Sequence, residues 1–129
     1  MFEFLLVTSD KNALSALASA LEKHDDAQLS WAESGSKALN MVSDTPVDLL
    51  ITNEKLEDMT GLELATRLLS INPMINCAAV STLSPDKFHE ASEGMGLMAQ
   101  LPSKPGGEEA ERLFNRIKDL KDITAGMNH

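Results

Sequence analysis

Short apolar runs recur along the chain and alternate with segments whose apolar residues follow a helical spacing. The clearest run covers residues 47–52, where Val47, Leu49, Leu50 and Ile51 precede a polar segment. A run of this length without clean polar–apolar alternation is typical of a strand that is buried on both faces. Runs of this kind predict five strands, at residues 4–7, 28–32, 47–52, 75–80 and 97–101.

The intervening segments carry apolar residues at intervals of three and four, as amphipathic helices do. Ser34 or Ser36 can cap the second helix, and Ser84 before Pro85 suits the start of the fourth. We expect helices at about 10–23, 34–44, 62–71, 84–93 and 108–122. Strict alternation of five strands and five helices predicts one parallel sheet between helices, a flavodoxin-like (βα)5 domain. The domain is expected to span residues 1–123, with a frayed tail at 124–129.

The composition is that of an acidic globular protein of one domain. A formal net charge of −9 over 129 residues argues against nucleic acid and anionic membranes as partners, because both attract basic surfaces. No apolar run approaches the roughly 18 residues of a membrane span, and the N-terminus lacks the pattern of a signal peptide. The single cysteine, Cys77, fits a reducing compartment. We therefore expect a cytoplasmic protein.

Polar side chains follow four of the five predicted strands. Because the carboxyl ends of parallel strands lie at one edge of a sheet, these side chains are predicted to share a site at the edge where ligands usually bind. The candidate residues are Thr8, Ser9 and Asp10 after the first strand, Asn53 after the third, Ser81 after the fourth and Lys104 after the fifth.

This arrangement resembles the receiver domain of two-component response regulators over nearly the whole chain. The segment VDLLITNEKLEDMTGLEL is similar to the family's third-strand signature, and FLLVTS is similar to its first-strand signature. In the family, two acidic residues after the first strand hold Mg²⁺, and an Asp after the third accepts a phosphoryl group from a histidine kinase. By this resemblance Asn53 stands at the acceptor position, and Thr8 and Ser9 stand at the acidic pair. Ser81 and Lys104 match the hydroxyl and lysine positions.

The sequence departs from the family pattern at positions that take part in phosphoryl transfer and Mg²⁺ binding in the family. Asn53 carries an amide, which is not the anionic nucleophile that phosphoryl transfer needs. Thr8 and Ser9 offer neutral hydroxyls where Mg²⁺ is bound mainly through carboxylates. Leu101 occupies the family's aromatic switch position. These differences predict a degenerate receiver without catalytic activity or cofactor, whose Mg²⁺ binding is lost or weak and which acts through protein–protein interaction.

The resemblance also implies a partner surface and a role for the lysine. The family's usual surface, formed by the fourth helix, fifth strand and fifth helix, corresponds to Pro85 to Glu93, Leu97 to Leu101 and Glu108 to Asp122. Lys104 is expected to hydrogen-bond the Asn53 carbonyl and neighbouring strand-end groups, with an external anion as the alternative.

Two other functions stay open. The chain could still be phosphorylated on a different carboxylate, for which Asp10, Glu54 and Asp58 are the candidates. It could also be a cofactor carrier, because flavodoxins share the topology. The segment after the first strand, TSDKN, would then be the phosphate-binding loop, but it lacks glycine and contains an acid.

Overall fold

A computed structural model describes residues 1–127, and the surroundings of the side chains for residues 1–121. Five parallel strands form one sheet in the order β2-β1-β3-β4-β5. The strands are β1 (Phe2–Val7), β2 (Ala27–Ala32), β3 (Leu49–Thr52), β4 (Asn76–Val80) and β5 (Leu97–Leu101). All five predicted strands are therefore confirmed, although β1 begins two residues earlier than predicted and β3 two residues later.

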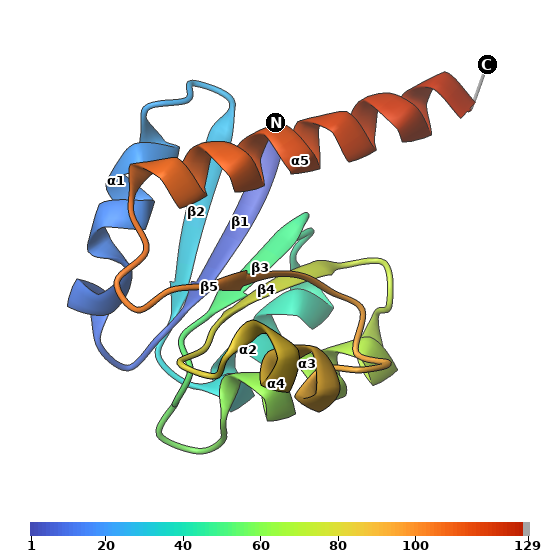
Figure 1. Cartoon of the computed structure of the whole chain (residues 1–129). Helices are drawn as coiled ribbons and strands as arrows, with labels where there is room; N and C mark the ends of the chain where they lie inside the picture. Colours follow the sequence, from blue (N-terminus) through green and yellow to red (C-terminus); the bar gives the residue numbers. More distant parts are fainter. Residues whose placement is uncertain (128–129) are drawn as a thin grey trace.

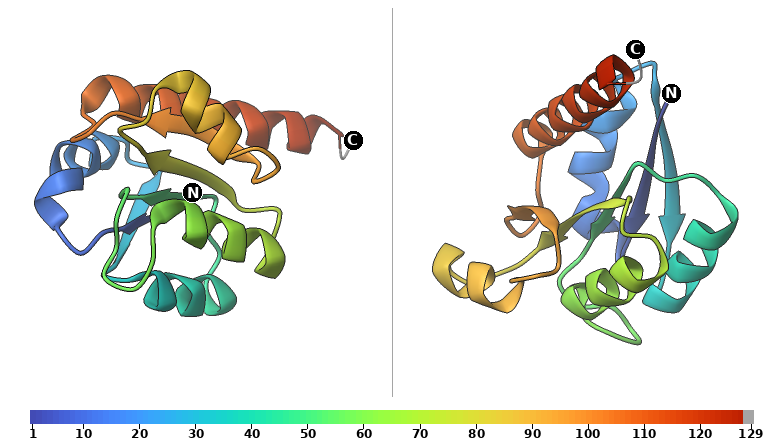
Figure 2. Two further views of the ribbon diagram at one scale, coloured as in Figure 1. Left: turned by 60° about the horizontal axis from the view of Figure 1, so that its bottom comes forward. Right: turned by 90° about the vertical axis from the view of Figure 1, so that its right-hand side faces the viewer.

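Helices cover both faces of this sheet, which confirms the flavodoxin-like architecture. They are α1 (Ser15–Glu22), which follows the 3-10 turn η1 (Lys11–Leu14), α2 (Gly35–Asp44), α3 (Gly61–Ile71), α4 (Pro85–Ala91) and α5 (Gly107–Met127). Helices α1 and α5 lie on one face, and α2, α3 and α4 lie on the other (Figures 1 and 2).

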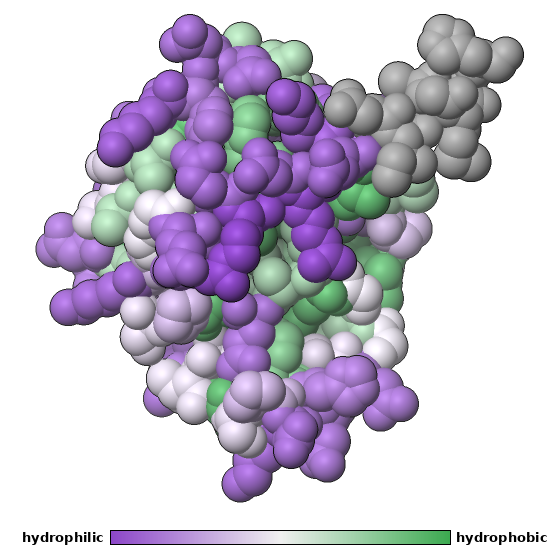
Figure 3. Space-filling model, turned by 45° about the horizontal axis from the view of Figure 1, so that its top comes forward, coloured by the Kyte–Doolittle hydropathy of each residue, from purple (hydrophilic) through white to green (hydrophobic). Residues whose placement is uncertain are grey.

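The last helix is longer than the sequence pattern predicts. It continues to Met127 instead of ending near Asp122, and it projects past the sheet (Figure 1). The predicted domain boundary at residue 123 therefore falls inside α5, and residues 128–129 of the predicted tail lie outside the described residues. Hydrophilic residues dominate the upper part of the surface in Figure 3, with hydrophobic areas between them.

The central strands β1, β3 and β4 are largely buried on both sides, because helices cover both faces of the sheet and successive side chains point to opposite faces. Phe4 and Leu6 of β1 pack in the core beneath α1 and α5, whereas Leu5 and Val7 of the same strand pack beneath α2 and α3. The unbroken apolar run of β1 thus fills two cores at once. This packing explains why the buried strands lack polar–apolar alternation.

Side-chain caps fix the starts of the helices and hence the loops around the sheet edge. Ser34 and Ser84 accept the backbone N–H groups of residues three positions later, as does Thr60. This geometry selects Ser34 over Ser36 as the cap of α2 and confirms Ser84 as the cap of α4.

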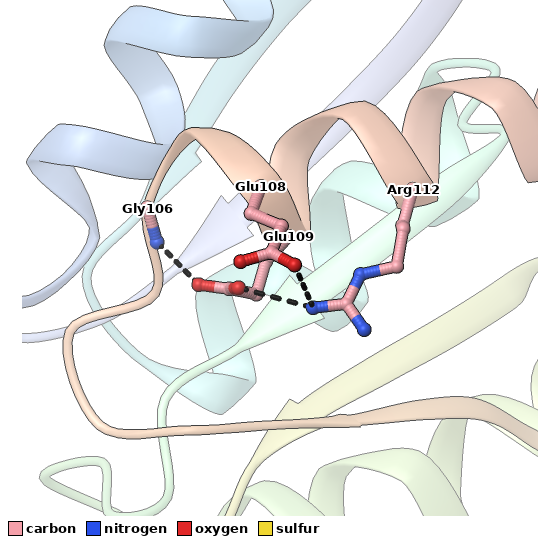
Figure 4. Close-up of polar contacts among 4 residues, drawn as sticks. All are labelled: Gly106, Glu108, Glu109 and Arg112. Carbon is pink, nitrogen blue, oxygen red and sulfur yellow. Dashed lines mark hydrogen bonds and ion pairs between the residues drawn. The ribbon is translucent and has the colours of Figure 1, made fainter.

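The start of α5 is held by a carboxylate in place of a hydroxyl. Glu109 Oε1 accepts the N–H of Gly106 at 2.8 Å, and Glu109 Oε2 lies 3.1 Å from Arg112 Nη2. Glu108 Oε1 lies 4.0 Å from the same nitrogen (Figure 4). Acidic residues at this end also complement the positive end of the helix dipole.

Candidate functional site

The carboxyl ends of β1 and β3 meet through a contact between Thr8 and Asn53. Thr8 directly follows β1 and is 2% exposed, and Asn53 directly follows β3. Asn53 Nδ2 donates a hydrogen bond to Thr8 Oγ1 at 3.1 Å. The same hydroxyl accepts the N–H of Asp10 at 3.0 Å and donates to the Asp10 carbonyl at 2.8 Å. One donor and two acceptor positions are all that a hydroxyl offers, so the capacity of Thr8 is fully used.

The other end of the Asn53 amide is also occupied. Its Oδ1 accepts the backbone N–H of Glu54 at 2.9 Å, and its own backbone N–H donates to the Val7 carbonyl at 2.9 Å. Because a backbone N–H can only donate, the contact with the Glu54 N–H identifies which atom of the Asn53 side-chain amide is the oxygen. The structure therefore brings Thr8 and Asn53 together as a neutral, mutually satisfied pair.

The three candidate acidic residues, Asp10, Glu54 and Asp58, form hydrogen bonds with three different parts of the chain. Asp10 Oδ1 accepts the N–H of Asn12 and so caps η1. Glu54 Oε2 accepts the N–H of Thr82 at 2.7 Å, in the loop between β4 and α4. The Asp58 carboxylate binds the start of α2. These carboxylates do not converge on Asn53.

The donors present at the strand ends do not suit Mg²⁺. This cation favours carboxylate oxygens, whereas Thr8 and Asn53 offer neutral atoms that are already hydrogen-bonded to each other. No cluster of three or more His, Cys, Asp or Glu residues able to hold a metal occurs among the described residues.

The side chains of two other predicted site residues, Ser81 and Ser9, do not take part in the Thr8–Asn53 contact. Ser81 follows β4 and is 7% exposed, and its Oγ accepts the N–H of Leu83 at 3.2 Å. Ser9 is exposed. Both residues are at the expected strand ends, but their side chains form no hydrogen bond to Asn53 in the described structure.

The predicted hydrogen bond from Lys104 to the Asn53 carbonyl is wrong. Lys104 is exposed, has a backbone φ of 51° and forms no hydrogen bond or ion pair within the part of the chain that the structure describes. Asn53 Oδ1 instead accepts the N–H of Glu54, and the exposed Lys104 ammonium keeps its contact with solvent.

Leu101 lies at the end of β5 and is buried, at 3% exposed. It packs in the core beneath α5 together with Leu113. Leu101 also lines a groove of about 190 Å³ between β5 and α5, together with Arg112 and Arg116. The residue that the family resemblance places at the switch position is therefore part of the core.

Sequence analysis missed two residues that organise this edge. Thr82 binds Glu54, and Gln100 Nε2 donates to the carbonyls of Leu83 and Ser81 at 2.8 and 3.3 Å. Gln100 is the one polar residue in the otherwise apolar run LMAQL. This polar residue within an apolar strand was the sequence feature that could have indicated a role for Gln100.

Asp58 joins the loop after β3 to the first turn of α2. Its two carboxylate oxygens accept the N–H groups of Ser36 and Gly35, each at 2.9 Å. These hydrogen bonds, that of Ser36 first, lower the pKa of Asp58 from its ordinary value of 3.8 to about 2. The positive end of the α2 dipole also favours the negatively charged form of the Asp58 carboxyl group.

The substitution Asp58→Asn is expected to remove a pH-dependent part of the stability. Because the folded-state pKa lies below the unfolded one, the carboxylate stabilises the fold above about pH 4 and loses this effect as the pH falls toward about 2. Urea unfolding across this range should show a steeper fall in the free energy of unfolding for wild type than for the variant. Glu57→Gln, a change at the exposed neighbouring residue, is the control. Equal slopes for wild type and Asp58→Asn would contradict the expected role of this carboxylate.

Comparison with known proteins identifies the class of this fold and site. The family model of the response regulator receiver domain matches residues 4–118, and the chain belongs to this family. A response regulator receiver protein of Anaeromyxobacter sp. (strain Fw109-5) is 30% identical over 102 residues, which cover 79% of this chain. The chain spans about 42% of the length of that relative.

Solved structures of receiver domains share the fold. The signal receiver domain of an HD domain-containing protein from Pseudomonas fluorescens Pf-5 superposes with a TM-score of 0.82 at 21% identity, over 97% of this chain and 92% of that one. A CheY-like receiver domain protein from Methanospirillum hungatei JF-1 gives a TM-score of 0.81 at 18% identity, over 95% and 98% of the two chains. The chain is thus a receiver domain of two-component signalling, a class that generally acts by interaction with signalling partners. Among the described helices, none is both long enough and apolar enough to cross a membrane.

Proposed function

We propose that this receiver domain signals through protein–protein interaction and is not phosphorylated at Asn53. The observation that carries the proposal is the hydrogen bond between Asn53 Nδ2 and Thr8 Oγ1 at 3.1 Å. It joins two neutral side chains at the strand ends where the family has an acceptor carboxylate and acidic metal ligands. An amide in this place supplies no anionic oxygen to attack a phosphorus atom.

The contacts of the remaining acids favour this proposal over phosphorylation on another carboxylate. Glu54 is next to Asn53 in sequence, but its oxygens accept the N–H and the hydroxyl of Thr82. Asp10 and Asp58 accept backbone N–H groups at helix starts. A carboxylate that accepts such bonds is held in place and loses nucleophilicity. Membership of the receiver family also removes the support for a flavodoxin-like cofactor carrier.

Incubation with acetyl phosphate, or with beryllofluoride, in the presence of Mg²⁺ is expected to leave the protein unchanged. Intact-mass spectrometry should show no phosphoryl adduct, and the amide NMR spectrum should not shift with beryllofluoride. A receiver domain with an aspartate acceptor, treated in parallel, shows that the reagents are active. A phosphoryl adduct that peptide mapping places on Asp10, Glu54 or Asp58 would establish the alternative function instead.

For the partner surface, we propose the face formed by α4, β5 and α5. The groove between β5 and α5 places the guanidinium groups of Arg112 and Arg116 beside apolar surface of Leu101 and Leu113. Arg112 is paired with Glu109, whereas Arg116 forms no ion pair within the described residues. Of the two arginines in this groove, Arg116 is therefore the one available to a partner's carboxylate.

Affinity capture from the native cell with wild-type protein is expected to recover a signalling protein that Arg116→Glu no longer retains. Arg67→Glu makes the same change of charge on the exposed surface of α3, on the other side of the sheet, and should retain the partner. Equal loss in both variants would place the binding surface elsewhere or indicate a general electrostatic effect.

A further inference from the structure

The loop that joins β4 to α4 is hydrogen-bonded to neighbours on both sides. On one side, Glu54 accepts the N–H of Thr82 at 2.7 Å and its hydroxyl at 3.1 Å. On the other side, Gln100 of β5 donates to the carbonyl of Leu83 at 2.8 Å and to that of Ser81 at 3.3 Å. Three consecutive residues of the loop are thus held by side chains from outside it.

Packing contributes little to the position of this loop. Thr82 and Leu83 are exposed, and a hollow of about 290 Å³ lies between this loop and the loop after β3. The hollow is lined by Glu54 and Thr60 of the loop after β3, by Leu62 of α3, and by Thr82 and Leu83 of the β4–α4 loop. Because Thr82 and Leu83 are exposed and free space lies beside them, polar contacts contribute more than close packing to the position of these two residues.

The position of the loop is passed on directly to α4. Ser84 ends the loop and caps the helix by accepting the N–H of Lys87, and Phe88 anchors the first turn in the core. Gln100 belongs to β5, so its amide also fixes the loop relative to that strand. The same contacts therefore set the relation between α4 and β5.

We propose that Glu54 and Gln100 fasten the β4–α4 loop in one arrangement, so that α4 and β5 are presented to a partner in a fixed relation without any input signal. The inference rests on the proposed function, since a receiver that is not phosphorylated at Asn53 has no such signal to transmit. Glu54 is suited to this role because a carboxylate forms stronger hydrogen bonds than a neutral acceptor. Leu101, the residue after Gln100 in β5, is buried in the core.

NMR relaxation dispersion on the amides of residues 81–88 tests the inference in the whole chain. Wild type should show no exchange on the microsecond to millisecond timescale in this segment. Glu54→Ala and Gln100→Ala, which release the loop from opposite sides, should each introduce conformational exchange in residues 81–88. Hydrogen exchange of the Thr82 amide should also become about tenfold faster or more in Glu54→Ala, because that amide loses its acceptor. Glu54→Gln keeps one acceptor oxygen and should restore most of the protection.

Glu57→Ala is the matched control, because Glu57 lies in the same loop as Glu54, is exposed and forms no hydrogen bond or ion pair within the described chain. This variant should behave like wild type. Exchange at residues 81–88 in unmodified wild type, or rigid loops in both alanine variants, would overturn the inference and leave the proposed function standing. A phosphoryl adduct in the intact mass of wild type would reject the proposed function, whatever the relaxation data show.

Discussion

Replacement of Gly61 by alanine is expected to lower the free energy of unfolding by about 2 kcal/mol, the size typical of overpacking a filled site. A Cβ atom at this position would lie 2.5 Å from the backbone oxygen of Asn53 and 3.0 Å from Thr52 Cγ2. Backbone cannot move aside as a flexible side chain can. The N–H of Gly61 also donates to the Glu54 carbonyl at 2.9 Å, which holds the start of α3 against the strand end. Urea unfolding measures the change.

Gly107→Ala is the control for this substitution. Gly107 is in the first turn of α5, and the nearest atom to its Cβ would be Ala20 Cβ at 3.9 Å, an ordinary contact. Alanine favours helix more than glycine, so this variant should be neutral or slightly more stable. If both substitutions lowered the free energy of unfolding equally, the close approach of the backbone at Gly61 would not be the reason that alanine is unfavourable at this position.

The central strands β1, β3 and β4 were predictable from the sequence because they are largely buried on both faces. The run at Leu49–Thr52, for example, lies between two cores, and its first three residues are all apolar. The end of α5 was not predictable in this way. An apolar stripe marks only the part of a helix that packs on the sheet, and backbone hydrogen bonds continue the helix beyond it to Met127.

The candidate site was predictable only in part. Parallel strands bring their carboxyl ends together, so the contact of Thr8 with Asn53 follows from the order of the elements. The hydrogen-bond partner of Asn53 Oδ1 was not predictable in this way. It is the backbone N–H of the next residue, Glu54, and the order of the elements does not indicate such a local contact. The contact of Glu54 with Thr82 depends on the shapes of two loops, and those shapes have no periodic signal in the sequence.

The triple substitution Thr8→Asp, Ser9→Asp and Asn53→Asp is expected to create Mg²⁺ binding, which we expect to be lost or weak in the wild type. It places carboxylates at the adjoining ends of β1 and β3, where the present chain has the neutral Thr8–Asn53 contact. Without metal the variant should be less stable than wild type, because like charges repel and position 8 is buried. Bound Mg²⁺ should offset this loss by RT ln(1 + [L]/Kd), which is about 1.4 kcal/mol at ninefold excess over Kd. For a domain of this size, that corresponds to a rise in Tm of a few degrees.

Thermal unfolding with and without millimolar Mg²⁺, at matched ionic strength, measures this effect in three proteins. The Tm of wild type should stay nearly constant, and Asn53→Asp alone should respond much less than the triple variant because it lacks the other two carboxylates. The triple variant should also gain some reactivity toward acetyl phosphate. That reactivity should remain weak because Lys104 is exposed and forms no hydrogen bond to residue 53. If the triple variant folds but binds no Mg²⁺, then side chains at positions 8, 9 and 53 do not converge on one point, and their assignment to a single site is wrong.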